Sequence, residues 1–187
     1  MKFSCQMCGE CCTRYTITVT QYDAHRIAKF TGLNPTSFLA VVRPHESVAS
    51  TYFDTPRIVL GGNDDNVLAL KEGHGACMFR KKNKCSIYSA RPLVCRPFPF
   101  TYSLKGSSDA DFTVNDDAPK FCKGVGKGSE KFDFSQLKRT VRVMETERNR
   151  LRKRIDRWNK KVTKGQIDKP RLNDLIKFLL PAVKRPN

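Results

Sequence analysis

Long hydrophobic runs are missing from this sequence. A membrane-spanning helix needs roughly 18 or more consecutive apolar residues, and the longest candidate, residues 176–183, is interrupted by Lys177 and Pro181. The residues before Cys5 also lack the apolar segment of a secretory signal peptide. We therefore expect a cytoplasmic protein that makes no membrane contact. In such a reducing compartment cysteines serve as thiols or metal ligands, and structural disulfides are rare.

Acidic residues are scarce. The 187-residue chain has 35 lysines and arginines but only 18 aspartates and glutamates, which gives a formal net charge of +17. The excess positive charges repel one another unless a polyanion or an acidic protein lies nearby. Nucleic acid is the most common partner of this kind, so we expect the chain to bind RNA or an acidic protein.

Familiar catalytic patterns are also missing. The three histidines form no Ser/His/Asp set and no Cys/His pair that spacing would reveal. The glycine-rich residues 124–129 are not a nucleotide-binding P-loop, because Phe121 and Gly128 stand where glycine and Ser or Thr are required. We interpret this stretch as a flexible linker or a weak anion contact.

Cysteine, in contrast, is abundant and clustered. The first four cysteines follow the pattern C-x2-C-x2-C-C, and four more lie later in the chain: Cys5, Cys8, Cys11, Cys12, Cys77, Cys85, Cys95 and Cys122. A C-x2-C turn lets two sulfurs meet one metal, and Gly9 permits the turn that follows Cys8. We therefore predict that this cysteine cluster binds zinc or an iron-sulfur cluster, for example one of the 4Fe-4S type.

The number and kind of sites stay open at this point. Thiolate ligands suit zinc and iron-sulfur clusters alike, and eight thiols are enough for two four-sulfur sites. Cys11 and Cys12 are adjacent and are expected to point in different directions, so one of them could serve a second site. His74, three residues before Cys77, is an alternative ligand. The spacing differs from C-x3-C-x2-C and from the ferredoxin pattern, which disfavours radical S-adenosylmethionine enzymes and ferredoxins.

Five short stretches together carry a family resemblance. They are FSCQMCGECC at 3–12, GACMF at 75–79, CSIY at 85–88, RPLVCRPFP at 91–99 and CKGVGKG at 122–128. They resemble the YkgJ-like CxxCxxCC family, which is described as a zinc- or iron-chelating domain with eight characteristic cysteines. The resemblance implies metal binding by all eight. Its relatives include iron-sulfur proteins and a flagellin lysine N-methylase, which adds a redox or methyl-transfer activity as an alternative.

Residue periodicity and turn residues predict the elements around the cysteines. We expect a strand at 16–20, then a helix that Thr20 caps and Gly32 ends, then a helix from Pro35 to about Val42. Further strands are expected at 52–60 and 67–71, with a turn at 61–66 between them. The proline-rich residues 90–100 are expected to form an extended lid over the cysteines.

The C-terminal third predicts a long amphipathic helix. It starts after a Ser135 cap and ends before Gly165, with apolar residues in steps of three and four: Leu137, Val141, Met144, Leu151, Ile155, Trp158 and Val162. Trp158 is expected to face the core, and Pro170 and Pro181 bracket a second, shorter helix. We therefore predict an α+β protein with a cysteine-cluster metal-binding domain at 1–130 and a basic helical extension at 131–187.

This long helix is strongly basic. Residues 138–164 contain twelve lysines and arginines against three acids, a local charge of +9. The residues that we predict to bind nucleic acid are Arg150, Arg152, Lys153, Arg154, Arg157, Lys160 and Lys161. Contacts of this kind reach phosphate groups and confer affinity without sequence specificity. The alternative is a solvated helix face.

We therefore favour a metal-containing module that binds RNA or a ribonucleoprotein such as the ribosome. One alternative is an iron-sulfur redox or methyl-transfer modification enzyme of the flagellin lysine methylase type, although no glycine motif for S-adenosylmethionine precedes a helix here. The other is a metal- or cluster-handling protein with an acidic protein partner.

Overall fold

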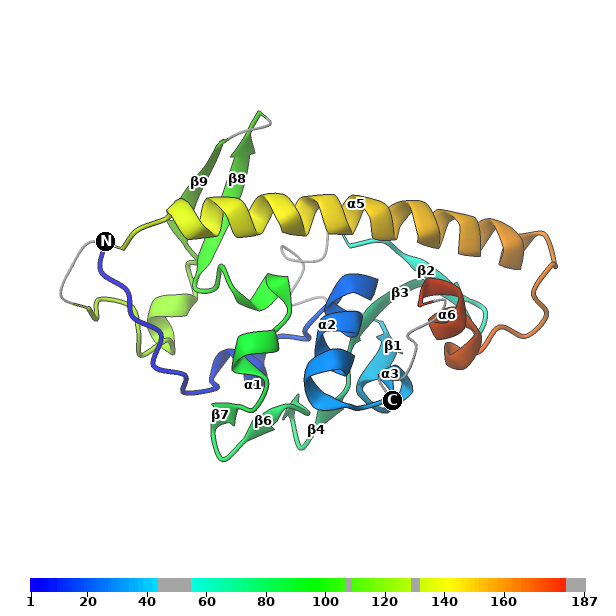
Figure 1. The fold of residues 1–187 in the computed structure, drawn as a ribbon, viewed down its shortest axis with the longest axis horizontal. Helices are drawn as coiled ribbons and strands as arrows, with labels where there is room; N and C mark the ends of the chain where they lie inside the picture. Colours follow the sequence, from blue (N-terminus) through cyan, green and yellow to red (C-terminus); the bar gives the residue numbers. More distant parts are fainter. Residues whose placement is uncertain (44–54, 107–108, 129–131, 181–187) are drawn as a thin grey trace.

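The computed structural model describes residues 1–43, 55–106, 109–128 and 132–180 (Figure 1). Its longest element, helix α5 (Ser135–Thr163), runs along the molecule; the shorter helices and most of the small antiparallel sheets lie beneath it, and the hairpin of β8 (Phe100–Lys105) and β9 (Asp109–Val114) projects past it. The predicted α+β class is therefore confirmed. Among the described residues, no helix is long and apolar enough to cross a membrane.

A three-stranded antiparallel sheet forms the centre of the fold. Its strands are β1 (Leu39–Val42), β2 (Ile58–Leu60) and β3 (Asn63–Leu70), in the order β1-β3-β2. The last four residues of β3 are all buried, as expected for a strand that is covered on both faces. Gly61 and Gly62 alone connect β2 to β3, so the turn predicted at 61–66 is shorter than expected. The predicted strand residues 52–54 lie outside the described part of the chain.

The helix predicted from Pro35 to Val42 is wrong beyond its first turn. Helix α3 covers only Pro35–Phe38, and strand β1 follows directly. Two of the β1 residues, Val41 and Val42, are β-branched and prefer strand geometry. Val41 lies opposite Leu68 of β3, so pairing with the sheet outweighs the local helical pattern.

Helix α2 (Gln21–Thr31) has the predicted ends. The Thr20 hydroxyl accepts a hydrogen bond from the Asp23 backbone N–H at 3.2 Å, and the Asp23 carboxylate accepts one from the Thr20 backbone N–H at 3.0 Å. This reciprocal pair is the capping box that starts a helix. Gly32 ends the helix at φ 71°. The strand predicted at 16–20 is reduced to a single bridge between Thr18 and Ala69.

The part of the molecule that carries the cysteines is built from short elements. They are α1 (Cys11–Arg14), β4 (Glu72–Gly73), β5 (Ala76–Cys77), β6 (Arg80–Lys81), β7 (Lys84–Cys85), β8 (Phe100–Lys105), β9 (Asp109–Val114) and the 3-10 turns η2 (Tyr88–Ala90), η3 (Leu93–Cys95) and η4 (Ala118–Lys120). The extended lid predicted at 90–100 is wrong, because η3 makes a helical turn there. Pro92 stands just before η3, where the fixed φ of proline suits the start of a helical turn.

Helix α5 packs on the sheet through its apolar stripe. Leu151, Ile155 and Trp158 are each at most 2% exposed, so the prediction that Trp158 faces the core is confirmed. The indole N–H of Trp158 donates to the Val59 carbonyl at 3.0 Å, and the Asn159 side chain accepts the Val59 backbone N–H at 2.9 Å and donates to the carbonyl of Arg57, just before β2, at 2.8 Å. Hydrogen bonds to β2 therefore fix the helix at a set position along the sheet.

The two ends of α5 also follow the prediction, with one change. The helix starts at Ser135, but Ser135 is its first residue and not its cap, because Asp133 accepts the Ser135 backbone N–H at 2.8 Å. After α5 the chain turns back into α6 (Leu172–Leu179), whose Phe178 ring lies 5.5 Å from that of Trp158. Pro181 lies outside the described residues. The core therefore includes side chains from both sides of residue 130, and the division predicted there stays a prediction.

A buried ionic cluster, which the sequence did not reveal, joins α2 to α5. The Arg26 guanidinium donates to both carboxylate oxygens of Glu147, at 2.6 and 2.8 Å, and to Asp23 at 2.6 Å. Asp23 also accepts the backbone N–H of Leu93, in η3, at 2.9 Å. Glu147 is only 8% exposed. This cluster, Asp23, Arg26 and Glu147, ties the long helix to the turn that carries Cys95.

Replacing Glu147 by alanine should destabilise the fold. Loss of the carboxylate leaves the Arg26 charge without its main partner, and breaking a buried pair costs about 3 kcal/mol or more. We take the lower figure because 31% of the Arg26 side chain stays exposed. Urea denaturation followed by circular dichroism measures the change. Asp156→Ala is the control, because Asp156 is exposed on the same helix; equal unfolding midpoints for the two variants would contradict the prediction.

Candidate metal centre

All eight cysteines line one cavity of about 380 Å³. The four N-terminal thiols come from the first loop and α1, and the other four come from β5, β7, η3 and the segment after η4. None of the eight is in a disulfide. Residues that are more than a hundred positions apart in the chain therefore meet around the same space. The sequence predicted the eight cysteines as ligands but did not predict that they meet around one cavity.

The N-terminal segment brings the first cysteines to Cys122. The Ser4 backbone N–H donates to the Gly124 carbonyl at 3.2 Å, and Phe3 forms an antiparallel bridge with Val125. A Cβ on Gly124 would collide with the Ser4 carbonyl. The N-terminal segment and the segment after Cys122 can therefore approach this closely only with glycine at that position. The prediction of a flexible linker is therefore wrong at Gly124 and Val125, which are paired.

Cys11 and Cys12 both face the cavity. They begin the short helix α1, and their side chains share a hydrogen bond. The expected difference in their directions therefore does not keep either side chain out of the cavity, and a second site for one of them stays a prediction. Successive residues of a helix are separated by only 100° of rotation, and a cavity of this width accepts both side chains.

The loop between Cys8 and Cys11 lies against the β6–β7 hairpin. Gly9 has a φ of 70°, and a Cβ there would lie 2.9 Å from the carbonyl oxygen of Asn83 and 3.0 Å from Nε of Arg80. The glycine predicted to allow the turn thus serves two purposes, since it takes a left-handed conformation and lets the hairpin come close. This contact places the loop that follows Cys8 against the hairpin that carries Cys85.

Backbone N–H groups are directed at three of the sulfurs. The N–H of Phe79 donates to Cys77, that of Ile87 to Cys85, and those of Gly124 and Val125 to Cys122. The first donor always lies two residues after its cysteine. Hydrogen bonds to a thiolate favour its charged form, so each acts to lower the pKa of its thiol. This is the backbone arrangement that a metal-bound thiolate needs.

Burial acts in the opposite direction on the thiols. It raises the pKa of Cys77 to about 11 and the pKa of Cys95 well above its usual value, because an apolar site disfavours the charged form. At Cys11 the hydrogen bond with Cys12 is the larger cause of a raised pKa, and burial is second. Thiols in this environment ionise when a cation lies beside them, as a thiophilic metal does.

The residues present fit a thiol-bound metal in donor type and in enclosure. Eight thiols converge on a cavity that is otherwise lined largely by apolar and aromatic side chains, among them Phe3, Phe79 and Phe98. Among the described residues, however, no three cysteine, histidine or acidic side chains already surround a single metal position. His74, the alternative ligand, is exposed in the turn between β4 and β5 and does not line the cavity.

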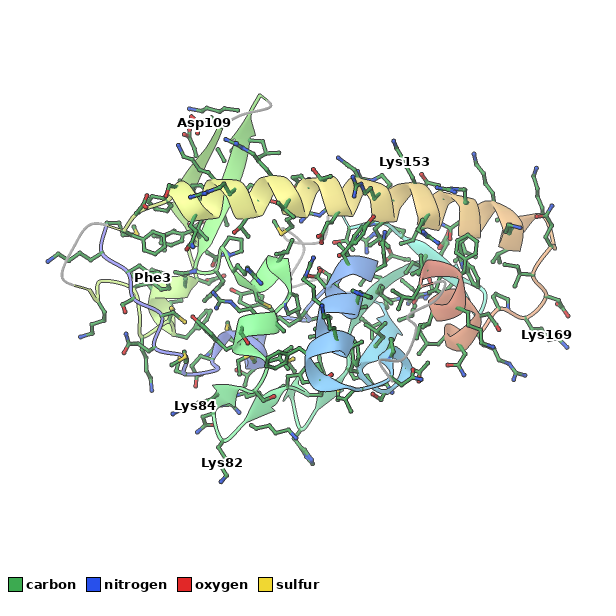
Figure 2. All side chains as sticks on the ribbon, in the orientation of Figure 1. Phe3, Lys82, Lys84, Asp109, Lys153 and Lys169 are labelled. Carbon is green, nitrogen blue, oxygen red and sulfur yellow. The ribbon has the colours of Figure 1, made fainter. Side chains whose placement is uncertain are left out.

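The residues predicted to bind nucleic acid all lie on α5, away from the cavity lining. Those with exposed side chains are Arg150, Lys153, Arg157, Lys160 and Lys161. Lys153 points away from the body of the molecule (Figure 2). Arg152 and Arg154 are half-buried: Arg152 donates to Asn149 at 2.8 Å, and Arg154 donates to the carbonyl of Phe178, in α6, at 3.1 Å.

Two polar residues of the cavity were not predicted from the sequence. Tyr88 hydrogen-bonds the Cys5 thiol, and the Arg91 guanidinium lies over the Tyr88 ring, 4.3 Å from its centre. Both line the cavity. The signal that could have found them is their position within the motifs CSIY and RPLVCRPFP, since each motif joins a cysteine to a second chemically active side chain.

Substituting Gly9 by alanine should destabilise the cysteine loop. A left-handed alanine costs about 1–2 kcal/mol, and the contact with Asn83 adds a cost of about 1–3 kcal/mol for overpacking. Gly32→Ala is the control, because Gly32 has a φ of 71° with no atom near its would-be Cβ. Urea denaturation of both variants measures the difference. Equal losses would show that the hairpin can move aside.

Comparison with known proteins agrees with these features. The family model CxxCxxCC, described as "Putative zinc- or iron-chelating domain", matches residues 4–123. An uncharacterized protein of Methanocaldococcus jannaschii is 27% identical over 145 residues, which are 76% of this chain and 69% of that protein. No solved structure matches the chain. The family match covers more than half of the sequence and all eight cysteines, so the chain belongs to the CxxCxxCC family.

Proposed function

We propose that the protein holds zinc or an iron-sulfur cluster through the eight cysteines of the cavity. The observation that carries this proposal is the meeting of all eight thiols around one space. Backbone N–H groups directed at three of the sulfurs support it, because they stabilise thiolates. Two four-thiol sites are compatible with the donor count, and zinc and iron-sulfur clusters both accept four thiolates.

When bound, such a group would cross-link distant segments or transfer electrons. The chain's own contribution is then to gather the ligands and to exclude water. Cys5, Cys8, Cys11 and Cys12 would supply ligands from one local segment, and the later cysteines would close the site from β5, β7, η3 and the segment after η4. Because these elements are short, much of the stability of this region would come from metal binding.

We further propose that the outer face of α5 binds RNA or a ribonucleoprotein such as the ribosome, in the cytoplasm. Lys153, Arg157 and Lys160 recur at steps of four and three and so share one face of the helix. In the described chain none of them pairs with a carboxylate. Two of the three acids of this helix are engaged on its inner side, Glu147 with Arg26 and Glu145 with Tyr102 and Arg148.

This leaves an outer face that is almost purely cationic. The helix has 29 residues, so at a rise of 1.5 Å per residue it is about 44 Å long. A cationic face of that length suits a phosphate backbone.

Metal analysis tests the proposal most directly. Protein purified without oxygen is assayed for zinc, iron and acid-labile sulfide, and its visible spectrum is recorded. Iron and sulfide in near-equal amounts with a broad visible absorbance would favour a redox or methyl-transfer modification role. One or two zinc ions in colourless protein would favour a structural site. Protein that binds none of these after reconstitution would overturn the proposal.

Cys8→Ser should lose metal and fold together. A hard hydroxyl replaces a soft thiolate, and the binding energy of a thiolate site is folding energy. We expect metal content per chain to fall and the far-ultraviolet circular dichroism of the soluble fraction to weaken. A monomeric variant that keeps its helical signal while holding no metal would contradict the structural part of the proposal.

Replacing Lys153, Arg157 and Lys160 together by glutamine should weaken RNA binding. Each lost phosphate contact on single-stranded RNA lowers the slope of log K against log salt by about 0.7, so three contacts lower it by about 2. Fluorescence anisotropy of a labelled single-stranded RNA across a salt series measures the slope.

The matched control neutralises Lys81, Lys82 and Lys84, which removes the same charge. Lys82 and Lys84 lie on the opposite side of the molecule from Lys153 (Figure 2). Equal slopes for the two triple variants would show that α5 offers no dedicated site.

A further inference from the structure

Arg91 is the single cation among the residues that line the cysteine cavity. The chain has 35 lysines and arginines, yet among the described residues around this cavity the only other charged side chain is Glu10. A surface arginine would be unremarkable in so basic a protein. An arginine that alone enters an apolar, thiol-lined space needs a specific reason.

The position of Arg91 is fixed by its neighbours. Its guanidinium lies over the ring of Tyr88, 4.3 Å from the centre, and Pro92 follows it at the entrance to η3. Tyr88 in turn hydrogen-bonds Cys5. Stacking on an aromatic face holds a guanidinium plane in one orientation, and Arg91 also hydrogen-bonds the Tyr88 side chain. The charge is therefore held at the cavity wall by a side chain that is partly buried.

The effect of Arg91 extends to thiols from three separate elements. At Cys85 and Cys95 burial is the main cause of a raised pKa, and the positive charge of Arg91 opposes that rise. The same charge opposes the rise at Cys11, where the hydrogen bond with Cys12 is the main cause. These cysteines belong to β7, η3 and α1 respectively, and Arg91 lines the cavity that all three share.

Charge balance gives this position a role. Four thiolates around a divalent ion leave a net charge of −2, and a charge in an apolar site is costly unless it is paired. We propose that Arg91 is a positioning residue for the metal-thiolate centre, where its fixed positive charge offsets the excess negative charge of the bound thiolates. The inference rests on the proposed metal function and adds a residue that is not a ligand.

Substitution of Arg91 tests this role. Arg91→Met removes the charge and keeps an apolar stem of similar reach, Arg91→Gln keeps hydrogen-bond donors without charge, and Arg91→Lys keeps the charge. Zinc affinity is measured on each full-length protein by competition with a chromophoric chelator. Loss of an outer partner of metal ligands typically lowers affinity 10- to 100-fold. We expect a loss of that size in Arg91→Met and Arg91→Gln, with zinc stoichiometry at saturation unchanged, and recovery to within about three-fold in Arg91→Lys.

Arg14→Met is the matched control. Arg14 also lies over an aromatic ring, with its guanidinium 4.5 Å from the centre of Phe121, but it is exposed and does not line the cavity. We expect its zinc affinity to match that of the unaltered protein. Cobalt substitution gives a second readout, because the energies of the thiolate-to-cobalt charge-transfer bands should shift in Arg91→Met and not in Arg14→Met.

The outcomes separate the two proposals. Zinc affinity that is unchanged in Arg91→Met, or equally weak in Arg91→Lys and Arg91→Gln, overturns the charge-balance role while the metal function stands. If the unaltered protein binds no zinc and takes up no iron-sulfur cluster, the metal function fails and this inference fails with it. Misfolding of Arg91→Met would show in its circular dichroism, and the comparison of Arg91→Lys with Arg91→Gln then decides the question.

Discussion

The gathering of eight thiols in a largely apolar cavity is the constraint on which the rest of this structure depends. Burial raises the pKa of Cys77 and Cys95, so these thiols resist ionisation until a cation compensates for their charge. Two local features favour the charged form of these thiols: backbone N–H groups directed at sulfurs, and Arg91 in the cavity wall. The short elements around the cavity then follow, because turns present N–H groups that long helices and strands would use internally.

Helix α5 is apolar on its inner face and cationic on its outer face. Its inner stripe packs on the sheet, and Trp158 and Asn159 hydrogen-bond to β2. Two of its three acids also lie inward, most clearly Glu147, which Arg26 holds with two hydrogen bonds. This removes negative charge from the outer face. The same ionic cluster reaches the backbone of η3 through Asp23, so the helix and a cysteine-bearing turn share one buried anchor.

Features encoded by neighbouring residues were predictable from the sequence. The ends of α2 follow from the Thr20 and Asp23 cap and from Gly32, and the length of α5 follows from its apolar period. The first four cysteines stand out as ligands by their spacing, and the family resemblance implied the other four. Predictions failed where contacts with a distant segment outweigh local preference. Val41 and Val42 were predicted in a helix but pair with β3. Gly124 was predicted in a flexible linker, but its carbonyl accepts a hydrogen bond from the Ser4 backbone N–H.

The sequence by itself therefore determined which side chains can bind a soft metal and where a cationic helix lies, because thiol chemistry, charge and helical period are properties of short segments. The tertiary structure alone decided that eight cysteines from separate elements share one cavity. It also selected Arg91 from the many cations as the one within that lining, and Glu147 as the acid that pairs with Arg26. These choices depend on contacts between segments far apart in the chain, which packing of the core creates and local spacing cannot express.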